Sequence, residues 1–250
     1  MIFSRIPFRI SLFGGGTDFP EWFLKNKGLV ISTTINKYAT LGLRYLPPFF
    51  HHKYRVVYSK IDLANTINQI SHPVVKAALK FYKEKKGIEL YYYGDLPARS
   101  GIGSSSSFTV GFIHLLHKIK NKNISKNELA RQAIKIEREV LGEAGGWQDQ
   151  VIAAHGGFKF INFQEKKFIV KNVNINKQSI EKLSKSLLMF YSGDVRSSYL
   201  IQESFKKNIS KLNSELRSVY EIANEAKKIL LSEKNYFELG KMMNESWQIK

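Results

Sequence analysis

The sequence predicts an α+β fold in two lobes, because the spacing of its apolar residues changes along the chain. Residues 38–45 alternate apolar with polar side chains and are rich in β-formers, and residues 88–93 end at a turn signal. After Gly103 the apolar residues recur at helical spacing, and beyond Ser197 nearly the whole pattern is helical and charged. We therefore expect strands to dominate the first part and helices the last.

The composition is that of an ordinary globular protein with a basic surface. The chain has 250 residues, a formal net charge of +18 and no cysteine. Such a charge suits nucleic acid, an acidic membrane or phosphorylated small molecules. The lysines are scattered, however, with no dense tract and no arginine-aromatic stripe, which favours a solvating role. Without a signal peptide or an apolar run of roughly 18 residues, we expect a cytoplasmic protein with no membrane or nucleic-acid partner.

Two helices are predicted in the middle of the chain. The first starts within a serine run, and its apolar side carries residues three and four apart: Phe108, Phe112, Leu115 and Ile119. The second opens at Ser125, which with Glu128 forms a capping box, and continues to about Leu141.

The remaining segments predict a hairpin, a connection and further helices. Residues 157–163 and 168–173 read as the hairpin, and residues 187–191 as a buried strand. A lysine-rich connection at 177–185 is the best boundary, dividing the chain into domains 1–183 and 184–250. Because the helical pattern stops with the apolar Trp247 unpartnered, we expect the carboxy-terminal domain to be incomplete.

The stretch LPARSGIGSSSSF, residues 96–108, has the pattern of an anion-binding loop. It joins a strand to a helix start, where amides lack an intrahelical partner and the helix dipole is positive. Glycines allow close approach of a phosphate, and serine hydroxyls bind phosphate oxygens or Mg²⁺. The stretch lacks the Lys-Ser/Thr pair of a P-loop. The alternative is a flexible linker, although linkers do not run straight into a patterned apolar helix.

A second glycine-rich stretch, FGGGTD, follows the predicted strand near the amino terminus. Its consecutive glycines permit a sharp turn, and the Asp18 carboxylate offers an acceptor for sugar hydroxyls. The alternative is a β-turn in which Asp18 caps the following helix, and the two roles can coexist.

Two carboxylates are candidates for chemistry. Glu137 lies on the apolar side of its predicted helix, so it needs a cation or donors; we interpret it as a Mg²⁺ ligand, with an internal salt bridge as the alternative. Asp149, in GGWQDQ, is presented by a glycine-bent segment and suits a general base, or else a helix cap. Arg196, at a predicted turn, suits a phosphate or a surface ion pair. The histidines lack the spacing of zinc ligands.

PFRISLFGGGTD together with LPARSGIGSSSSF resembles the GHMP kinase superfamily, and in particular its branch of bacterial D-glycero-D-manno-heptose 7-phosphate kinases. The resemblance covers essentially the whole chain, although the third glycine-rich segment of the superfamily is not found in it. It implies a ribosomal-protein-like α/β amino-terminal lobe that binds ATP and Mg²⁺, and a ferredoxin-like carboxy-terminal lobe.

The resemblance also implies a role for each matching residue. Asp149 would be the catalytic base, and Arg9 would stabilise transferred charge. Mg²⁺ would be held by Ser105 and Glu137. ATP would be bound by the loop residues Pro97, Gly101, Ile102, Gly103, Ser104, Ser105 and Ser106. The substrate would be bound by Gly15, Gly16, Thr17, Asp18 and Arg196.

The activity implied by the resemblance is phosphorylation of the anomeric hydroxyl of a sugar. The expected substrate is D-glycero-D-manno-heptose 7-phosphate, which would give the 1,7-bisphosphate. The alternatives are a kinase for fucose, galactose or a uronic acid and, from another class, a basic nucleic-acid-binding module.

Overall fold

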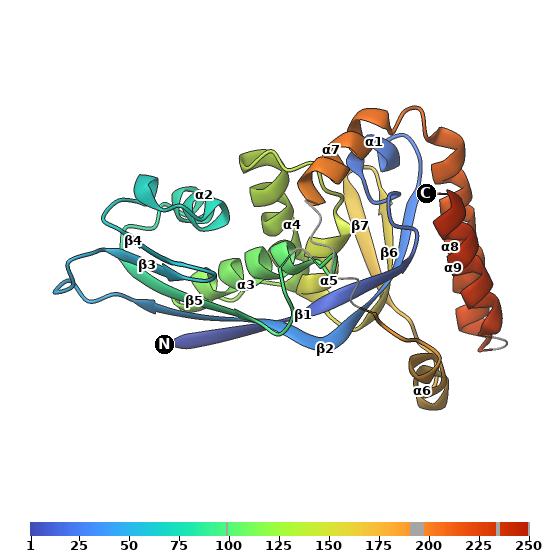
Figure 1. Ribbon diagram of the computed structural model, residues 1–250, viewed down its shortest axis with the longest axis horizontal. Helices are drawn as coiled ribbons and strands as arrows, with labels where there is room; N and C mark the ends of the chain where they lie inside the picture. The colour runs from blue at the N-terminus through green and yellow to red at the C-terminus, as the bar shows by residue number, and fades with distance from the viewer. Residues whose placement is uncertain (99, 191–197, 234–235, 250) are drawn as a thin grey trace. The chain divides into compact units, whose positions relative to one another are not determined.

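The computed structural model describes residues 1–98, 100–190, 198–233 and 236–249, without the side chains of 198–200 (Figure 1). The chain forms two compact units, each assembled from separate parts of the sequence. Unit 1 consists of Met1–Phe8, Ile35–Ala144 and Asp149–His155. Unit 2 consists of Arg9–Thr34, Gly145–Gln148 and Gly156–Lys250.

The sheet of unit 1 is built around the second half of a long strand, β2 (Gly28–Tyr45). Its strands follow the order β4 (Ile61–Ala64), β3 (Tyr54–Val57), β5 (Ile88–Gly94) and β2, and β1 (Ile2–Phe13) also pairs with β2. β3 runs parallel to β5, whereas β2 is antiparallel to β5 with Leu43 opposite Leu90. The strands predicted at 38–45 and 88–93 are confirmed.

The helices of unit 1 include α2 (Pro73–Phe81), α3 (Ser104–Lys118), α4 (Lys126–Ile134), η2 (Lys135–Val140) and α5 (Gln148–His155), besides the short turn η1 (Ile67–Gln69). The predicted start of α3 within the serines is confirmed, and so is the cap of α4, where the Ser125 hydroxyl accepts from the Glu128 amide. Helix and sheet share a core that includes Phe8, Leu41, Leu43, Ile88, Leu90, Val110, Phe112 and Ile113.

Unit 2 contains the first half of β2, which pairs with β6 (Phe158–Gln164), and β6 pairs with β7 (Lys167–Asn172). All of these pairings are antiparallel, and they confirm the predicted hairpin. The helices are α1 (Pro20–Phe23), α6 (Lys177–Lys185), α7 (Ser198–Asn208), α8 (Asn213–Ser232) and α9 (Phe237–Ile249). Figure 1 shows α8 and α9 side by side. Their core includes Phe13, Leu29, Ile31, Phe160, Ala223, Ala226 and Leu230.

Two predictions about the segment after β7 need correction. Residues 177–185 are not a plain connection but the helix α6, which Asn176 caps by accepting from the Ser179 amide at 2.8 Å. Residues 187–190 are not a buried strand: they have no regular structure, and Leu188 and Phe190 are 81% and 84% exposed. A strand needs a neighbour for its backbone groups, and this run has none in the described part of the chain.

The α+β class predicted from the sequence is confirmed. The boundary at residue 183 is a division by sequence and stays a prediction. Among the described residues, no helix is both long enough and apolar enough to cross a bilayer.

Candidate active site

The serine-glycine loop joins β5 to α3 through two left-handed residues. Gly101 and Gly103 have φ angles of 73° and 72°, a region that favours glycine. Gly103 is the residue that precedes α3, and a Cβ at Gly101 would meet no atom within 4 Å, so backbone conformation rather than space requires glycine there. The Ser100 hydroxyl donates to the Pro97 carbonyl at 2.7 Å. The first amides of α3 follow directly, as an anion site needs.

The four serines of α3 differ in exposure and therefore in what they can bind. Ser105 is exposed and Ser104 half-buried, whereas Ser106 and Ser107 are buried. The Ser106 hydroxyl donates to Oε2 of Glu137 at 2.9 Å. The structure thus brings Ser106, rather than the predicted Ser105, to the buried carboxylate. Ile102, also predicted at the nucleotide, is buried in the hydrophobic core of unit 1 at 8% exposure.

Glu137 lies in η2, a short π-helical segment, and is 2% exposed. Ser106 and Gln150 both donate to its Oε2, while Oε1 has no hydrogen-bond partner among the described residues. Burial and, to a smaller extent, the nearby Glu143 carboxylate raise the pKa of Glu137 to about 7, against the opposing effect of the surrounding hydroxyl and amide groups. Ser106 and Gln150 are neutral partners, whereas the alternative of an internal salt bridge requires a cationic one.

The unpaired oxygen of Glu137 is the observation that fits a metal ion. Mg²⁺ prefers oxygen ligands, keeps several waters, and is held through one or two carboxylates together with substrate phosphates. Glu137 supplies one such carboxylate close to the start of α3 through Ser106. No cluster of three His, Asp or Glu side chains occurs among the residues that the structure describes, so the remaining ligands would be hydroxyl, water and phosphate oxygens.

Asp149 lies one residue before Gln150, whose side chain binds Glu137. It is half-buried and occupies the first turn of α5. Because it is the second residue of that helix, it does not stand at the capping position that the alternative interpretation required. The structure thus brings Ser106, Glu137 and Gln150 together and places Asp149 next to them in the chain.

In unit 2 the FGGGTD stretch forms a tight turn in which the Thr17 amide donates to the Gly14 carbonyl at 3.0 Å. Gly14 has a φ of 81°, and a Cβ there would lie 1.8 Å from the Leu29 carbonyl oxygen. The Thr17 side chain is fully buried, donates to the Gly14 carbonyl at 2.8 Å and accepts from the Leu29 amide at 3.1 Å. These bonds use Thr17 to close the turn.

The other residues predicted at the substrate differ in accessibility. Gly15, Gly16 and Arg9, which lies in β1, are half-buried. The Asp18 side chain is fully buried, and α1 has Phe19, without a side-chain hydrogen bond, at its capping position, so Asp18 does not cap that helix. Arg196 lies outside the described residues.

Two side-chain contacts, those of Gln150 and His72, were not predicted from the sequence. Gln150 binds Glu137, and its only signal was that glutamines flank Asp149. His72 stacks on Phe108, the first large apolar residue of α3, with ring centroids 4.4 Å apart. Burial lowers the pKa of His72 to about 4. No local pattern marks a contact between residues so far apart in the chain.

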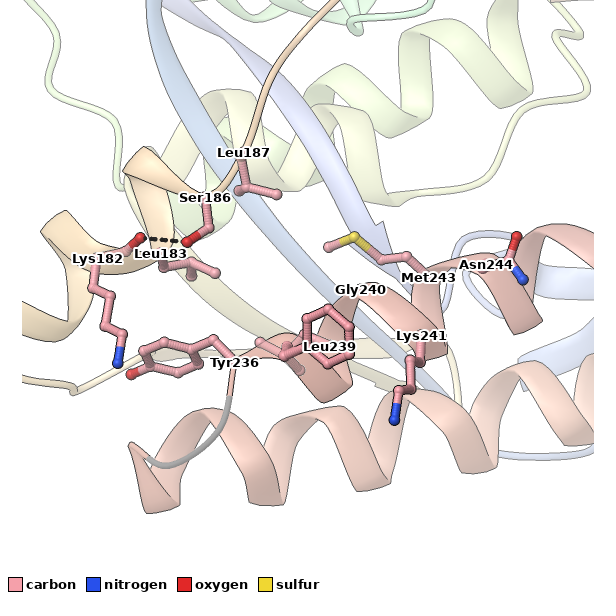
Figure 2. A pocket seen from close by; sticks show the side chains of 11 residues that line it. Lys182, Leu183, Ser186, Leu187, Tyr236, Leu239, Gly240, Lys241, Met243 and Asn244 are labelled. Carbon is pink, nitrogen blue, oxygen red and sulfur yellow. Dashed lines mark hydrogen bonds between the residues drawn. The ribbon is translucent and has the colours of Figure 1, made fainter.

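A separate pocket of about 660 Å³ occurs in unit 2 (Figure 2). Its lining residues all come from 182–187 and 236–244, among them Leu183, Tyr236 and Met243. The Ser186 hydroxyl donates to the Lys182 carbonyl at its edge. None of its lining residues is among those predicted for phosphoryl transfer.

Comparison with known proteins shows which family this chain resembles. Residues 72–157 match the family of GHMP kinases N terminal domain. The D-glycero-alpha-D-manno-heptose 7-phosphate kinase of Campylobacter jejuni is 30% identical over 262 residues, which cover 99% of this chain and 76% of that protein.

Two solved structures share the fold over the whole chain. A D-glycero-D-manno-heptose 1-phosphate kinase from Bacteroides thetaiotaomicron superposes with a TM-score of 0.81 at 24% identity, covering 100% of this chain and 79% of that one. A phosphomevalonate kinase of Streptococcus pneumoniae, in complex with phosphomevalonate and AMPPNP, gives a TM-score of 0.74 at 14% identity with the same coverage.

Proposed function

Because the chain belongs to the GHMP kinase superfamily and its heptose phosphate kinase relatives indicate a phosphotransferase that acts on a sugar hydroxyl, we propose that it phosphorylates the anomeric hydroxyl of a heptose phosphate. ATP is the phosphoryl donor of this superfamily. The proposed substrate is D-glycero-D-manno-heptose 7-phosphate and the product its 1,7-bisphosphate. The kinase of Campylobacter jejuni, whose name states a 7-phosphate substrate, supports this choice.

One observation carries the mechanism: Glu137, with one unpaired oxygen, is hydrogen-bonded to Ser106 at the start of α3 and to Gln150, the neighbour of Asp149. In the proposed site the amides of residues 101–106 and the exposed Ser105 hydroxyl bind the triphosphate. Glu137 holds Mg²⁺, which when bound neutralises phosphate charge.

Asp149 is the proposed general base. Its carboxylate takes the proton of the anomeric hydroxyl as that oxygen forms a bond to the γ-phosphorus. The bond from the γ-phosphorus to the oxygen that bridges the β- and γ-phosphates breaks, and ADP leaves. Arg9 stabilises the charge of the transferred group, and Gly15, Gly16 and Arg196 are proposed contacts of the sugar phosphate. Positioning and charge neutralisation account for most of the expected rate enhancement.

The deciding experiment is an assay of ATP consumption over sugars and sugar phosphates, with phosphorus NMR to locate the new ester. Heptose 7-phosphate should be phosphorylated at its anomeric oxygen, and the heptose without phosphate should be a far poorer substrate. The Asp149→Asn variant should lose roughly 10²- to 10⁴-fold in kcat. Faster turnover of fucose, galactose or a uronic acid would favour the alternative sugar kinases and overturn the proposed substrate.

The nucleic-acid alternative is motivated by the net charge of +18. It requires that Asp149→Asn leave all measurable function intact while added salt abolishes tight RNA binding. The buried Glu137 cluster favours the kinase.

A further inference from the structure

We propose that Asp18 is a positioning residue for Asp149 rather than a contact of the substrate. This inference rests on the proposed function, in which Asp149 is the base, and it assigns Asp18 a different task from the one the family resemblance implies. Its starting point is burial: the Asp18 side chain is 0% exposed. A sugar hydroxyl would have to displace the groups that already surround its carboxylate.

Those groups are the backbone and side chain of the segment that precedes Asp149. The Gln148 amide donates to Oδ2 of Asp18 at 3.1 Å, and Gln148 Nε2 donates to Oδ1 at 3.3 Å. The Trp147 amide donates to the Asp18 carbonyl oxygen at 3.0 Å. On the other side the Gly16 amide donates to Oδ1 at 2.9 Å. The carboxylate therefore links the FGGGTD turn to the GGWQ segment.

Gly146 shows how closely this segment approaches the carboxylate. A Cβ at Gly146 would lie 1.9 Å from Oδ2 of Asp18, far inside any van der Waals contact. Its neighbour Gly145 differs: a Cβ there would meet the end of the flexible Gln202 side chain at 3.1 Å. The requirement for glycine at position 146 thus follows from Asp18, and the adjacent position supplies a matched control.

The site of the hydrogen bond explains its effect on the base. Gln148 is the first residue of α5, so its amide lacks an intrahelical acceptor and the Asp18 carboxylate takes that place at the positive end of the helix dipole. Asp149 is the next residue. Fixing the Gln148 peptide therefore fixes the backbone that carries the base, and proton transfer depends on placement to within about 1 Å.

The first test compares Asp18→Asn, Gly146→Ala and the control Gly145→Ala in the full chain. An asparagine keeps the shape but turns one acceptor into a donor, so either the Gly16 or the Gln148 amide loses its partner. We expect Asp18→Asn and Gly146→Ala to lower kcat by on the order of 100-fold with the KM for sugar phosphate changed less than about 3-fold. Gly145→Ala should resemble the parent. A rise in KM as the main effect of Asp18→Asn would overturn the proposal.

The second test repeats both substitutions in the Asp149→Asn background. Once the base is absent, misplacing it has no further effect, so neither substitution should lower the residual kcat. A loss of the same factor in both backgrounds would show that Asp18 acts independently of Asp149, as a general structural role would, and would overturn the proposal.

Hydrogen exchange at the Gln148 amide needs no activity. In Asp18→Ala, which removes both acceptor oxygens, this amide should exchange faster while the α3 amides keep their protection. Unchanged exchange would refute the positioning role even in an active enzyme. If the parent protein phosphorylates no sugar, the proposed function fails, and the exchange experiment alone decides whether Asp18 holds this segment.

Discussion

At the scale of single residues, the buried carboxylate of Glu137 carries the most information. Its environment supplies neutral donors to one oxygen and leaves the other unpaired. An ionised carboxylate in such a place is unfavourable unless a cation joins it. An ionised Glu137 is thus stabilised when a metal ion is bound and destabilises the protein when none is.

Replacing Glu137 with glutamine should therefore separate activity from stability. Activity at saturating ATP should fall on the order of 100-fold or more and lose its dependence on Mg²⁺, because the charge that holds the ion is gone. Without metal, the same variant should be more stable than the parent above pH 7, where the raised pKa leaves a charged group buried. The exposed Glu139→Gln is the control, and Mg²⁺ titrations with urea unfolding provide the measurements. An unchanged Mg²⁺ dependence would remove Glu137 from the metal site.

His72 gives a prediction for acid stability. Burial lowers its pKa from 6.5 to about 4, so the unfolded chain binds more protons between these values. The contribution of neutral His72 is present above pH 6.5 and is lost as the pH falls toward 4. It amounts to about 1–3 kcal/mol, given the partial exposure of the ring. In urea titrations from pH 7 to pH 4, His72→Phe should keep the stack on Phe108 and weaken the pH dependence. A parallel profile in the variant would contradict this assignment.

At the scale of elements, α4 matters because it leads directly into η2 and Glu137. Ser125 begins α4 by accepting from the Glu128 amide at 3.2 Å. Ser125→Ala should lower the free energy of unfolding by about 0.5–2 kcal/mol. Ser125→Asp, which restores an acceptor, should recover most of that loss in urea unfolding. If both variants lose the same stability, the cap contributes little.

Local sequence signals predicted the strands at 38–45 and 88–93, the helices α3 and α4 and the helical pattern beyond residue 197, but failed at residues 177–190. The caps, the glycine loop and the alternation of 38–45 are properties of neighbouring residues, and each was found. The apolar run 187–190 satisfies the same local criteria for a strand, yet it is exposed, since strand formation depends on a partner that local pattern does not specify. Helix α6 was missed because its lysines hid the amphipathic spacing that buries Leu183.

The candidate site could be predicted only in part, because local pattern does not specify contacts between distant segments. Glu137 was found because helical spacing placed it among apolar residues. Gln150, His72 and the buried position of Asp18 were not, because each depends on contacts between distant segments. The choice of Ser106 over Ser105 as the partner of Glu137 depends on the angle at which α3 begins, which spacing alone does not supply.

At the scale of the whole molecule, the net charge of +18 comes from lysines and arginines scattered along the chain. Several lysines pair with a glutamate three or four residues away on the same helix: Lys177 with Glu181, Lys207 with Glu203, Lys228 with Glu225 and Lys241 with Glu238. Such exposed pairs add little stability, and their role is solvation.

Binding to polyanions should accordingly be weak and steeply dependent on salt. We expect the protein to elute from heparin at moderate ionic strength, while phosphorylation of the sugar phosphate changes far less over the same range. Retention of RNA at high salt, with a sequence preference, would contradict this and revive the nucleic-acid alternative.

The π-helical turn that carries Glu137 has a consequence for how such a chain can change. A π turn holds one residue more than an α turn, so deleting a single residue from 135–140 would let the backbone relax into a regular helix. That shorter variant should withstand heat better, because the helix on either side keeps its register once the extra residue is gone. The residues within the turn, however, would take new angles around the helix axis, which would move the Glu137 carboxylate away from Ser106 and Gln150. Selection for thermal stability therefore favours the loss of one residue from this turn, whereas selection for phosphoryl transfer favours keeping it.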